Sequence, residues 1–128
     1  MPRTAVIAIV DDDHSVREAL ASLVRSLGYA AIAFDCAEDL LKSKRRGGLS
    51  CLIADVQMPG MTGLELHQQL SASGKRIPTI LITAYPDDRV RERALAAGII
   101  GYLSKPFVEE DLLTCVRSAL TSAHRGRR

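Results

Sequence analysis

Near its start the chain reads Ala5-Val6-Ile7-Ala8-Ile9-Val10-Asp11-Asp12-Asp13, an apolar run that ends abruptly in carboxylates. A short apolar run without alternation is typical of a strand buried on both faces, as in a parallel sheet. The next residues, Ser15-Val16-Arg17-Glu18, predict a capping box with Ser15 as the N-cap of a helix. Apolar side chains then recur at helical spacing until Gly28, which is placed to end that helix. The stretch therefore predicts a strand followed by a helix.

The same alternation continues to the end of the chain. The further strands are expected at 30–34, 49–54, 77–82 and 99–103, and the further helices at 37–44, 62–74, 88–97 and 109–122. Thr62-Gly63-Leu64-Glu65 predicts a second capping box, at the start of the helix over 62–74. Strand–helix pairs joined by short links predict an α/β domain whose helices cover both faces of a parallel sheet.

Composition sets the class of protein and its domain count. With 128 residues, 47% of them apolar and 25% charged, the chain fits one globular domain. We expect that domain to span residues 1–122, with 123–128 as a flexible basic tail or the start of a linker. The formal net charge of +2 comes from Arg125, Arg127 and Arg128, so the folded body is not a basic surface for nucleic acid.

The sequence also indicates a compartment. No apolar run approaches the roughly 20 residues that span a bilayer, and no signal-peptide pattern precedes residue 5, so we expect a cytoplasmic protein without membrane contact. Cys36, Cys51 and Cys115 lie far apart and are expected to be reduced thiols. Cys36 precedes a predicted helix, where the pKa of a thiol can fall.

Polar residues follow the predicted strands, at the sheet edge where parallel α/β folds bind ligands. Asp11 and Asp12 follow the first strand, Asp55 the third, Thr83 the fourth and Lys105 the fifth. Clustered carboxylates repel one another unless a cation lies among them, and oxygen ligands suit a hard divalent ion.

These residue types also suit phosphoryl transfer. A site for Mg²⁺ (or Mn²⁺) would use the carboxylates together with a backbone carbonyl such as that of Gln57. Asp55 is then the candidate nucleophile that forms an aspartyl phosphate, with Lys105 and Thr83 stabilising the phosphoryl oxygens.

At these positions the sequence resembles the receiver (REC) domain of two-component response regulators. The resemblance rests on Val10-Asp11-Asp12, on residues 55–63 (Asp-Val-Gln-Met-Pro-Gly-Met-Thr-Gly), on Thr83-Ala84 and on Lys105-Pro106-Phe107. The sequence of residues 97–107 is similar to that of the FixJ-type branch of the family. The resemblance implies a flavodoxin-like, doubly wound (βα)5 three-layer sandwich with a parallel sheet of strand order 2-1-3-4-5.

It also implies a role for each site residue. Asp55 would accept a phosphoryl group from a histidine kinase or phosphotransfer protein, and Asp11, Asp12, Asp55 and the Gln57 carbonyl would bind Mg²⁺. Thr83 would contact the phosphoryl group, Lys105 would pair with it, and Tyr102 would be an aromatic switch coupled to Thr83. The Lys105–Pro106 peptide bond would be cis, and phosphorylation would promote a homodimer.

Three alternatives stay open on the sequence. A small phosphatase could also use an Asp nucleophile, although Gln57 stands where such enzymes carry a second acid. A flavin carrier could share the topology, and an interaction module could have lost phosphorylation. FixJ-type regulators usually continue into a DNA-binding domain, which would not fit after residue 122, so we expect either a single-domain regulator or a receiver without that domain.

Overall fold

Strands and helices alternate along the whole chain in the computed structural model, which describes residues 5–44, 46–74 and 76–125. The strands are β1 (Val6–Val10), β2 (Ala30–Phe34), β3 (Cys51–Asp55), β4 (Thr79–Thr83) and β5 (Gly101–Ser104). The helices are α1 (His14–Ser26), α2 (Ala37–Lys42), α3 (Gly63–Ala72), α4 (Asp88–Ala96) and α5 (Glu109–Arg125), with a short 3-10 helix η1 (Arg46–Gly48) before β3. The predicted succession of strand–helix pairs is confirmed.

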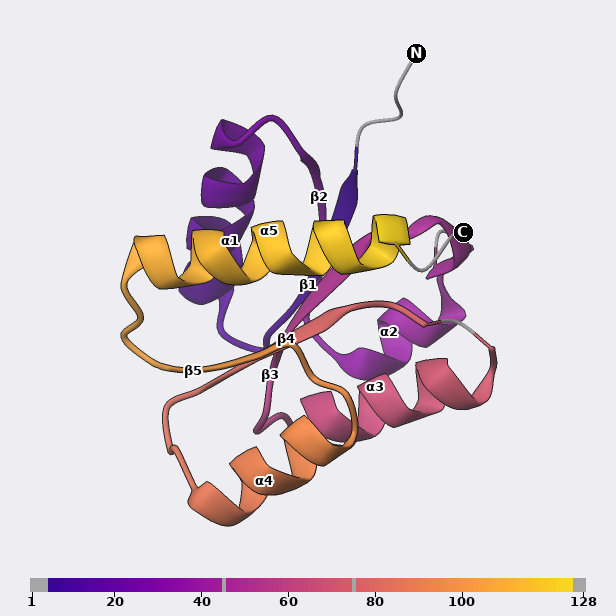
Figure 1. Ribbon diagram of the computed structural model, residues 1–128, viewed down its shortest axis with the longest axis vertical. Coiled ribbons are helices and arrows are strands. Elements are labelled where there is room, and N and C mark those ends of the chain that lie inside the picture. The colour runs from indigo at the N-terminus through magenta and orange to yellow at the C-terminus, as the bar shows by residue number, and fades with distance from the viewer. Residues whose placement is uncertain (1–4, 45, 75, 126–128) are drawn as a thin grey trace.

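The strands form one parallel sheet in the order β2-β1-β3-β4-β5. Each helix returns the chain to the edge where the previous strand began, which is why neighbouring strands run in the same direction (Figure 1). The order changes direction at β1 and β3, so the loops after these two strands diverge and leave room between them for a ligand. The predicted doubly wound fold and its strand order are confirmed.

Alternate residues of the inner strands pack on opposite faces of the sheet. Ile7 and Ile9 of β1 join a buried cluster with α1 and α5, whereas Ala8 and Val10 join a second cluster with α2, α3 and α4. Figure 1 shows α1 and α5 together on one side of the sheet and α2 to α4 on the other. Because both faces are covered, the inner strands lack polar alternation, and this is the pattern from which the parallel sheet was predicted.

The helix starts agree with the sequence at α3 and differ at α1. At α3, Thr62 and Glu65 form the predicted capping box. At α1 the N-cap is Asp13 and not Ser15, because the Asp13 carboxylate accepts hydrogen bonds from the backbone N–H groups of Ser15 (2.9 Å) and Val16 (3.2 Å). The helix therefore begins two residues earlier than a Ser15 cap would place it, with the free N–H groups of Ser15 and Val16 satisfied by a carboxylate, and the predicted Ser15 capping box is wrong.

Several element ends also differ from the prediction. Apolar Leu49, Ile77 and Ile99 were assigned to strands, yet they precede β3, β4 and β5 and are nevertheless buried. An apolar side chain can fill the core without pairing its backbone in the sheet, so hydrophobicity overstates strand length at these ends.

The last helix is longer than expected. α5 continues to Arg125, past the predicted end at residue 122, so part of the expected tail is helical and 126–128 lie outside the described residues. Within the described ranges, no helix combines the length and apolar character needed to cross a bilayer.

Candidate functional site

The strand ends bring the predicted polar residues to one edge of the sheet. Asp11 follows β1, Asp55 and Thr83 are the last residues of β3 and β4, and Lys105 follows β5. The strand register sets their levels, since Val10 pairs with Ala54 and Thr83 pairs with Ser104. Asp11 and Asp55 therefore end neighbouring strands at the same height.

Lys105 joins the two buried carboxylates. Its Nζ lies 2.9 Å from Asp11 Oδ2 and 2.9 Å from Asp55 Oδ2. Its backbone N–H donates to the Thr83 carbonyl at 2.7 Å, and the Lys105–Pro106 peptide bond is cis. Burial tends to lower the pKa of the Lys105 ammonium, but the hydrogen bonds and charges of Asp55 and Asp11 outweigh burial and raise that pKa. Lys105 is therefore a stable cation between two anions.

Asp11 is the most deeply buried charged group of the site. Its side chain is inaccessible to solvent, and burial, reinforced by the charge of Asp55, raises its pKa despite hydrogen bonds from the Asp13 N–H and from Lys105. A guanidinium also reaches this residue, because Arg17 Nη1 donates to the Asp11 carbonyl at 2.7 Å. This role of Arg17 was not predicted from the sequence. The one signal for it is the position of Arg17, one turn into the helix that follows the acidic run.

The acidic residues at this edge can share one cation. Asp11, Asp12 and Asp55 each offer a carboxylate oxygen, and these oxygens all lie within 4.8 Å of one another. Asp11 and Asp55 are buried and Asp12 is exposed, so the cluster has one side open to water. Several carboxylate oxygens beside a water-accessible side fit a hard divalent cation that keeps part of its hydration shell. Gln57 adjoins the cluster, with its backbone N–H donating to Asp55 Oδ1 at 3.0 Å.

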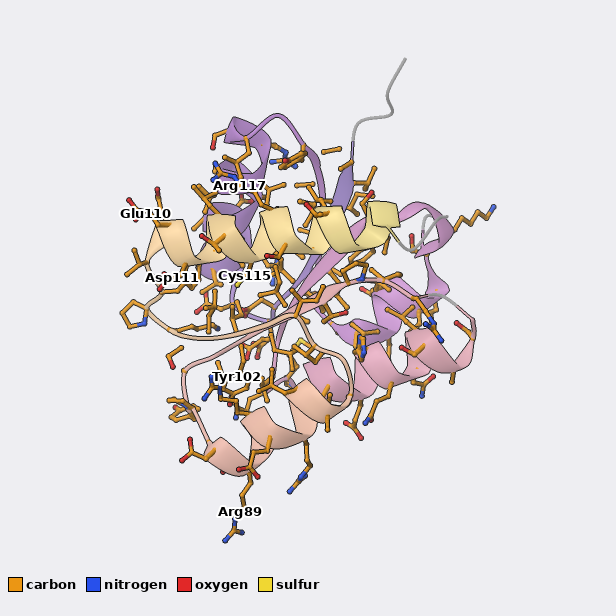
Figure 2. The ribbon with its side chains drawn as sticks, viewed as in Figure 1. Arg89, Tyr102, Glu110, Asp111, Cys115 and Arg117 are labelled. Carbon is orange, nitrogen blue, oxygen red and sulfur yellow. The ribbon has the colours of Figure 1, made fainter. Side chains whose placement is uncertain are left out.

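Thr83 and Tyr102, the predicted switch pair, make separate contacts in this structure. Thr83 Oγ1 donates to Gln57 Oε1 at 2.7 Å and accepts from the Tyr85 N–H at 3.0 Å. Tyr102 lies beside α4 (Figure 2), where its Oη accepts from the backbone N–H of Asp87, the N-cap of that helix, at 3.2 Å. The contact between the Gln57 side chain and Thr83 was not predicted from the sequence, which indicated a role at this site only for the Gln57 backbone carbonyl.

A glycine allows α3 to start against the candidate acceptor. A Cβ on Gly63 would overlap the backbone carbonyl oxygen of Asp55 and would lie 3.0 Å from a methyl group of Leu81. The first turn of α3 therefore passes directly over the end of β3. Gly63 was part of the quoted motif, but pattern alone gave no reason for a glycine there.

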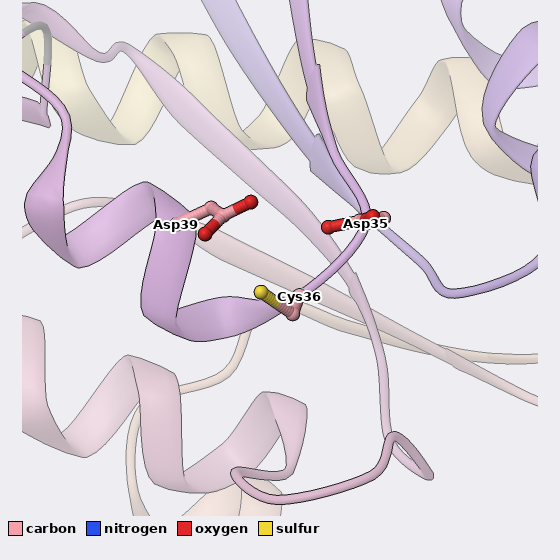
Figure 3. A group of neighbouring side chains, drawn as sticks. All are labelled: Asp35, Cys36 and Asp39. Atoms are coloured by element: carbon pink, nitrogen blue, oxygen red, sulfur yellow. The ribbon is translucent and has the colours of Figure 1, made fainter.

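A second group of possible ligands lies at the end of β2 and the start of α2, on the other side of β1 from Asp55. Asp35, Cys36 and Asp39 come close together there (Figure 3), and both carboxylates are exposed. Cys36 is the N-cap of α2 but makes no side-chain capping bond. The nearby backbone N–H of Asp39 favours the Cys36 thiolate, but partial desolvation and the neighbouring carboxylates outweigh it and raise the pKa of the thiol. The expectation of a lowered Cys36 pKa is therefore wrong.

The fold and this arrangement of polar groups define a class of signalling domain. The chain matches the model of the response regulator receiver domain over residues 7–117. It therefore belongs to the receiver-domain family of two-component signalling, which confirms the resemblance drawn from the sequence.

Relatives and solved structures agree with this assignment. The chain is 43% identical to the response regulator protein TodT of Pseudomonas putida over 98% of its own length and 55% of that protein. It is 35% identical to the transcriptional regulatory protein FixJ of Azorhizobium caulinodans, over 99% of its own length and 61% of that protein. The chain thus spans little more than half the length of these relatives.

The structure of the response regulator StyR superposes with a TM-score of 0.90 at 42% identity, covering 98% of this chain and 63% of StyR. The crystal structure of FixJ-N superposes with a TM-score of 0.82 at 29% identity, covering 94% of this chain and 96% of that one. Both likenesses extend over nearly all of the chain.

Proposed function

We propose that Asp55 is the phosphoryl acceptor of this receiver domain and that its donor is a phosphohistidine of a sensor kinase or phosphotransfer protein. The observation that carries the proposal is the Asp55 carboxylate, which ends β3, is only 5% exposed and is held by Lys105 Nζ and by the Gln57 N–H. A carboxylate fixed in this way is oriented as a nucleophile, and the nearby charges are placed to act on a phosphoryl group.

The transfer needs one bond to form and one to break. An Asp55 carboxylate oxygen forms the new O–P bond while the N–P bond of the phosphohistidine breaks, and the imidazole nitrogen keeps the electron pair. The Lys105 ammonium, 2.9 Å from Asp55 Oδ2, is placed to neutralise negative charge on the phosphoryl oxygens. The Thr83 hydroxyl supplies a hydrogen bond once it leaves its present partner.

Asp11, Asp12, Asp55 and the Gln57 backbone carbonyl would hold Mg²⁺, or Mn²⁺ in its place. The proximity of the three carboxylates supports this role. The bound ion would supply positive charge against the transferring oxygens. The chain's own contribution is to hold the carboxylates together in the absence of that charge, for which Lys105 provides the counterion.

Phosphorylation is proposed to change a protein–protein surface through Thr83 and Tyr102. Thr83 moves toward the phosphoryl group, and Tyr102 leaves the Asp87 N–H and turns inward. The output would be binding to another protein, with a homodimer as one form, without direct nucleic-acid binding by this chain. Such a domain works in the cytoplasm, where histidine kinases donate their phosphoryl groups.

The alternatives find less support in the site. A phosphatase would need an acid at residue 57 to protonate the leaving group, but Gln57 carries an amide whose oxygen already accepts from Thr83. A flavin phosphate would face the acidic loop at Asp11 and Asp12 and be repelled. A module without phosphorylation would not need the Lys105 ion pairs.

The decisive experiment measures incorporation of phosphate from acetyl phosphate in the presence of Mg²⁺. We expect labelling of the unaltered protein and only background labelling of Asp55→Asn, because an amide is not a nucleophile for phosphorus. Asp39→Asn is the matched control, since Asp39 belongs to the acidic group at α2 and lies outside the proposed site. Undiminished labelling of Asp55→Asn would remove Asp55 as the acceptor.

A further inference from the structure

We propose that the side chain of Gln57 is a positioning residue that holds Thr83 in its unphosphorylated arrangement and must release it before Thr83 can bind a phosphoryl group. The proposal rests on the proposed function of Asp55 and adds the regulation of that site. It follows from a single contact, the 2.7 Å hydrogen bond between Thr83 Oγ1 and Gln57 Oε1.

The Thr83 hydroxyl has no proton free to donate to a phosphate. A hydroxyl has one proton to donate, and here that proton goes to Gln57 Oε1, while the Tyr85 N–H donates to the oxygen at 3.0 Å. Because the Tyr85 N–H can only donate, the amide oxygen of Gln57 is the partner that accepts the hydroxyl proton. Donation to a phosphoryl oxygen therefore requires the bond to Gln57 to break.

Gln57 is held at its other end by the candidate acceptor. Its backbone N–H donates to Asp55 Oδ1 at 3.0 Å, so one residue links the ends of β3 and β4. Gln57 is exposed while Asp55 and Thr83 are buried, which places this link on the solvent side of the site. Gln57 is therefore the member of this link that solvent and a phosphoryl donor can contact.

Breaking this link has a cost that appears in the rate of phosphorylation. A neutral hydrogen bond contributes enough stability that its loss corresponds to about a two- to tenfold change in an equilibrium. The unphosphorylated arrangement is favoured by that factor, and a variant without the amide oxygen starts with Thr83 released. Gln57→Met keeps the length and the backbone N–H of residue 57 but offers no comparable acceptor.

The test measures acetyl phosphate labelling rates of Gln57→Met in two backgrounds, the otherwise unaltered protein and Thr83→Ala. We expect labelling about two- to tenfold faster in the first background and no change in the second, because without the hydroxyl there is nothing for Gln57 to hold. Gln68→Met, an exposed position on α3, controls for the substitution itself. An equal effect in both backgrounds would overturn the proposal, since Gln57 would then act directly on the phosphoryl group, and so would no effect in either.

A second measurement separates this proposal from the function of Asp55. In NMR spectra of the unphosphorylated protein, we expect the Thr83 hydroxyl proton to be protected from exchange, and Gln57→Met to remove that protection and shift the Thr83 methyl signal. Unchanged Thr83 signals in Gln57→Met would refute the link even if Asp55 is the acceptor. If Asp55→Asn were labelled normally, the proposed acceptor would fail while this measurement still tested the link.

Discussion

At the scale of single residues, Asp12 is the exposed member of a cluster of three carboxylates, of which Lys105 pairs with the other two, Asp11 and Asp55. We predict that Asp12→Asn raises the free energy of unfolding of the metal-free protein by about 0.2–1 kcal/mol, because it relieves repulsion without exposing a buried group. Urea unfolding in the presence of a chelator measures this difference.

Addition of Mg²⁺ should reverse the order of stability. The unaltered protein keeps all its carboxylate ligands and gains more from binding the ion than Asp12→Asn does. Glu92→Gln, an exposed acid on α4 outside both groups of possible metal ligands, serves as the control and should respond to Mg²⁺ as the unaltered protein does. An Asp12→Asn protein that is no more stable than the unaltered one in chelator would contradict the repulsion.

Chelation should also prevent labelling of Asp55. If the acidic cluster holds a divalent ion, removal of that ion leaves the approaching phosphoryl group facing uncompensated carboxylates, and the acetyl phosphate labelling rate should fall to background. Readdition of Mg²⁺ or Mn²⁺ should restore it, and Ca²⁺, which prefers more ligands and longer bonds, tests the size of the site. Labelling that is equally fast with and without chelator would contradict a metal-assisted transfer.

Cys51 gives the fold a pH dependence at the alkaline end. Burial in β3 raises the pKa of this thiol from 9.0 to about 12. A thiol whose pKa is higher in the folded protein binds its proton more tightly there than in the unfolded chain. The free energy of unfolding that the protonated thiol contributes is therefore fully present below pH 9 and is lost as the pH rises from 9 toward 12. The loss approaches about 1.4 kcal/mol per pH unit.

Comparison with Cys51→Ala isolates the part of the pH dependence of unfolding that comes from this thiol. The free energies of unfolding of the two proteins should run parallel below pH 8 and converge above pH 9, where only the unaltered protein loses stability through this thiol. Curves that stay parallel up to pH 11 would show that Cys51 ionises in the folded protein as easily as in the unfolded one.

At the scale of secondary-structure elements, the contact between β5 and α5 depends on Gly101. A Cβ at this residue would lie 2.6 Å from Cys115 Sγ, 3.2 Å from Cys115 Cβ and 3.4 Å from Ile80 Cγ2. Cys115 is carried by α5 (Figure 2), so a larger residue at Gly101 pushes this helix from the sheet. We predict that Gly101→Ala lowers the free energy of unfolding by about 1–3 kcal/mol.

Shortening the opposing side chain should recover part of this loss. Gly101→Ala is expected to cost less in a Cys115→Ala background, because the sulfur that the new methyl group meets is absent. Chemical unfolding of the unaltered protein, the two single variants and the double variant gives the coupling free energy between residues 101 and 115. An equal cost in both backgrounds would place the strain elsewhere.

At the scale of the whole molecule, α4 is the α-helix that buries the fewest residues in the core. Ala94 is its one buried residue, whereas α1 buries Leu20, Ala21 and Val24. Arg89 extends from α4 away from the sheet (Figure 2). A single hydrogen bond helps to fix each end of α4, from the Asp87 N–H to Tyr102 Oη and from His67 Nε2 to the Ala97 carbonyl. The helix nearest the proposed switch is therefore the one that moves at least cost.

Hydrogen exchange of the native protein tests this distribution of stability. Amides of α4 should open at lower free energy than those of α1, because fewer buried contacts are lost. His67→Leu should lower protection mainly at the last turn of α4, and Tyr102→Phe mainly at its first. Equal protection of α4 and α1, or identical effects of the two variants along α4, would contradict this arrangement.

The sequence by itself determined the class of fold and most of the candidate site. Apolar runs, glycines and capping residues act on neighbours in the chain, so their order shows the alternation of strands and helices without tertiary information. Because apolar strands stop at Asp11, Asp55 and Thr83, pattern alone also marked the sheet edge where these residues gather. The proposed functions of these residues remain predictions for the labelling experiments.

Only the tertiary structure decided which side chains touch. Lys105 bonds Asp11 from 94 positions away, and Gln57 bonds Thr83 from 26 positions away. Such contacts depend on strand register and on the paths of loops, which no local pattern encodes. The same reason explains why Asp13 replaces Ser15 as the cap of α1 and why buried Leu49 stands outside β3: several local solutions satisfy the same groups, and packing of the complete molecule selects among them.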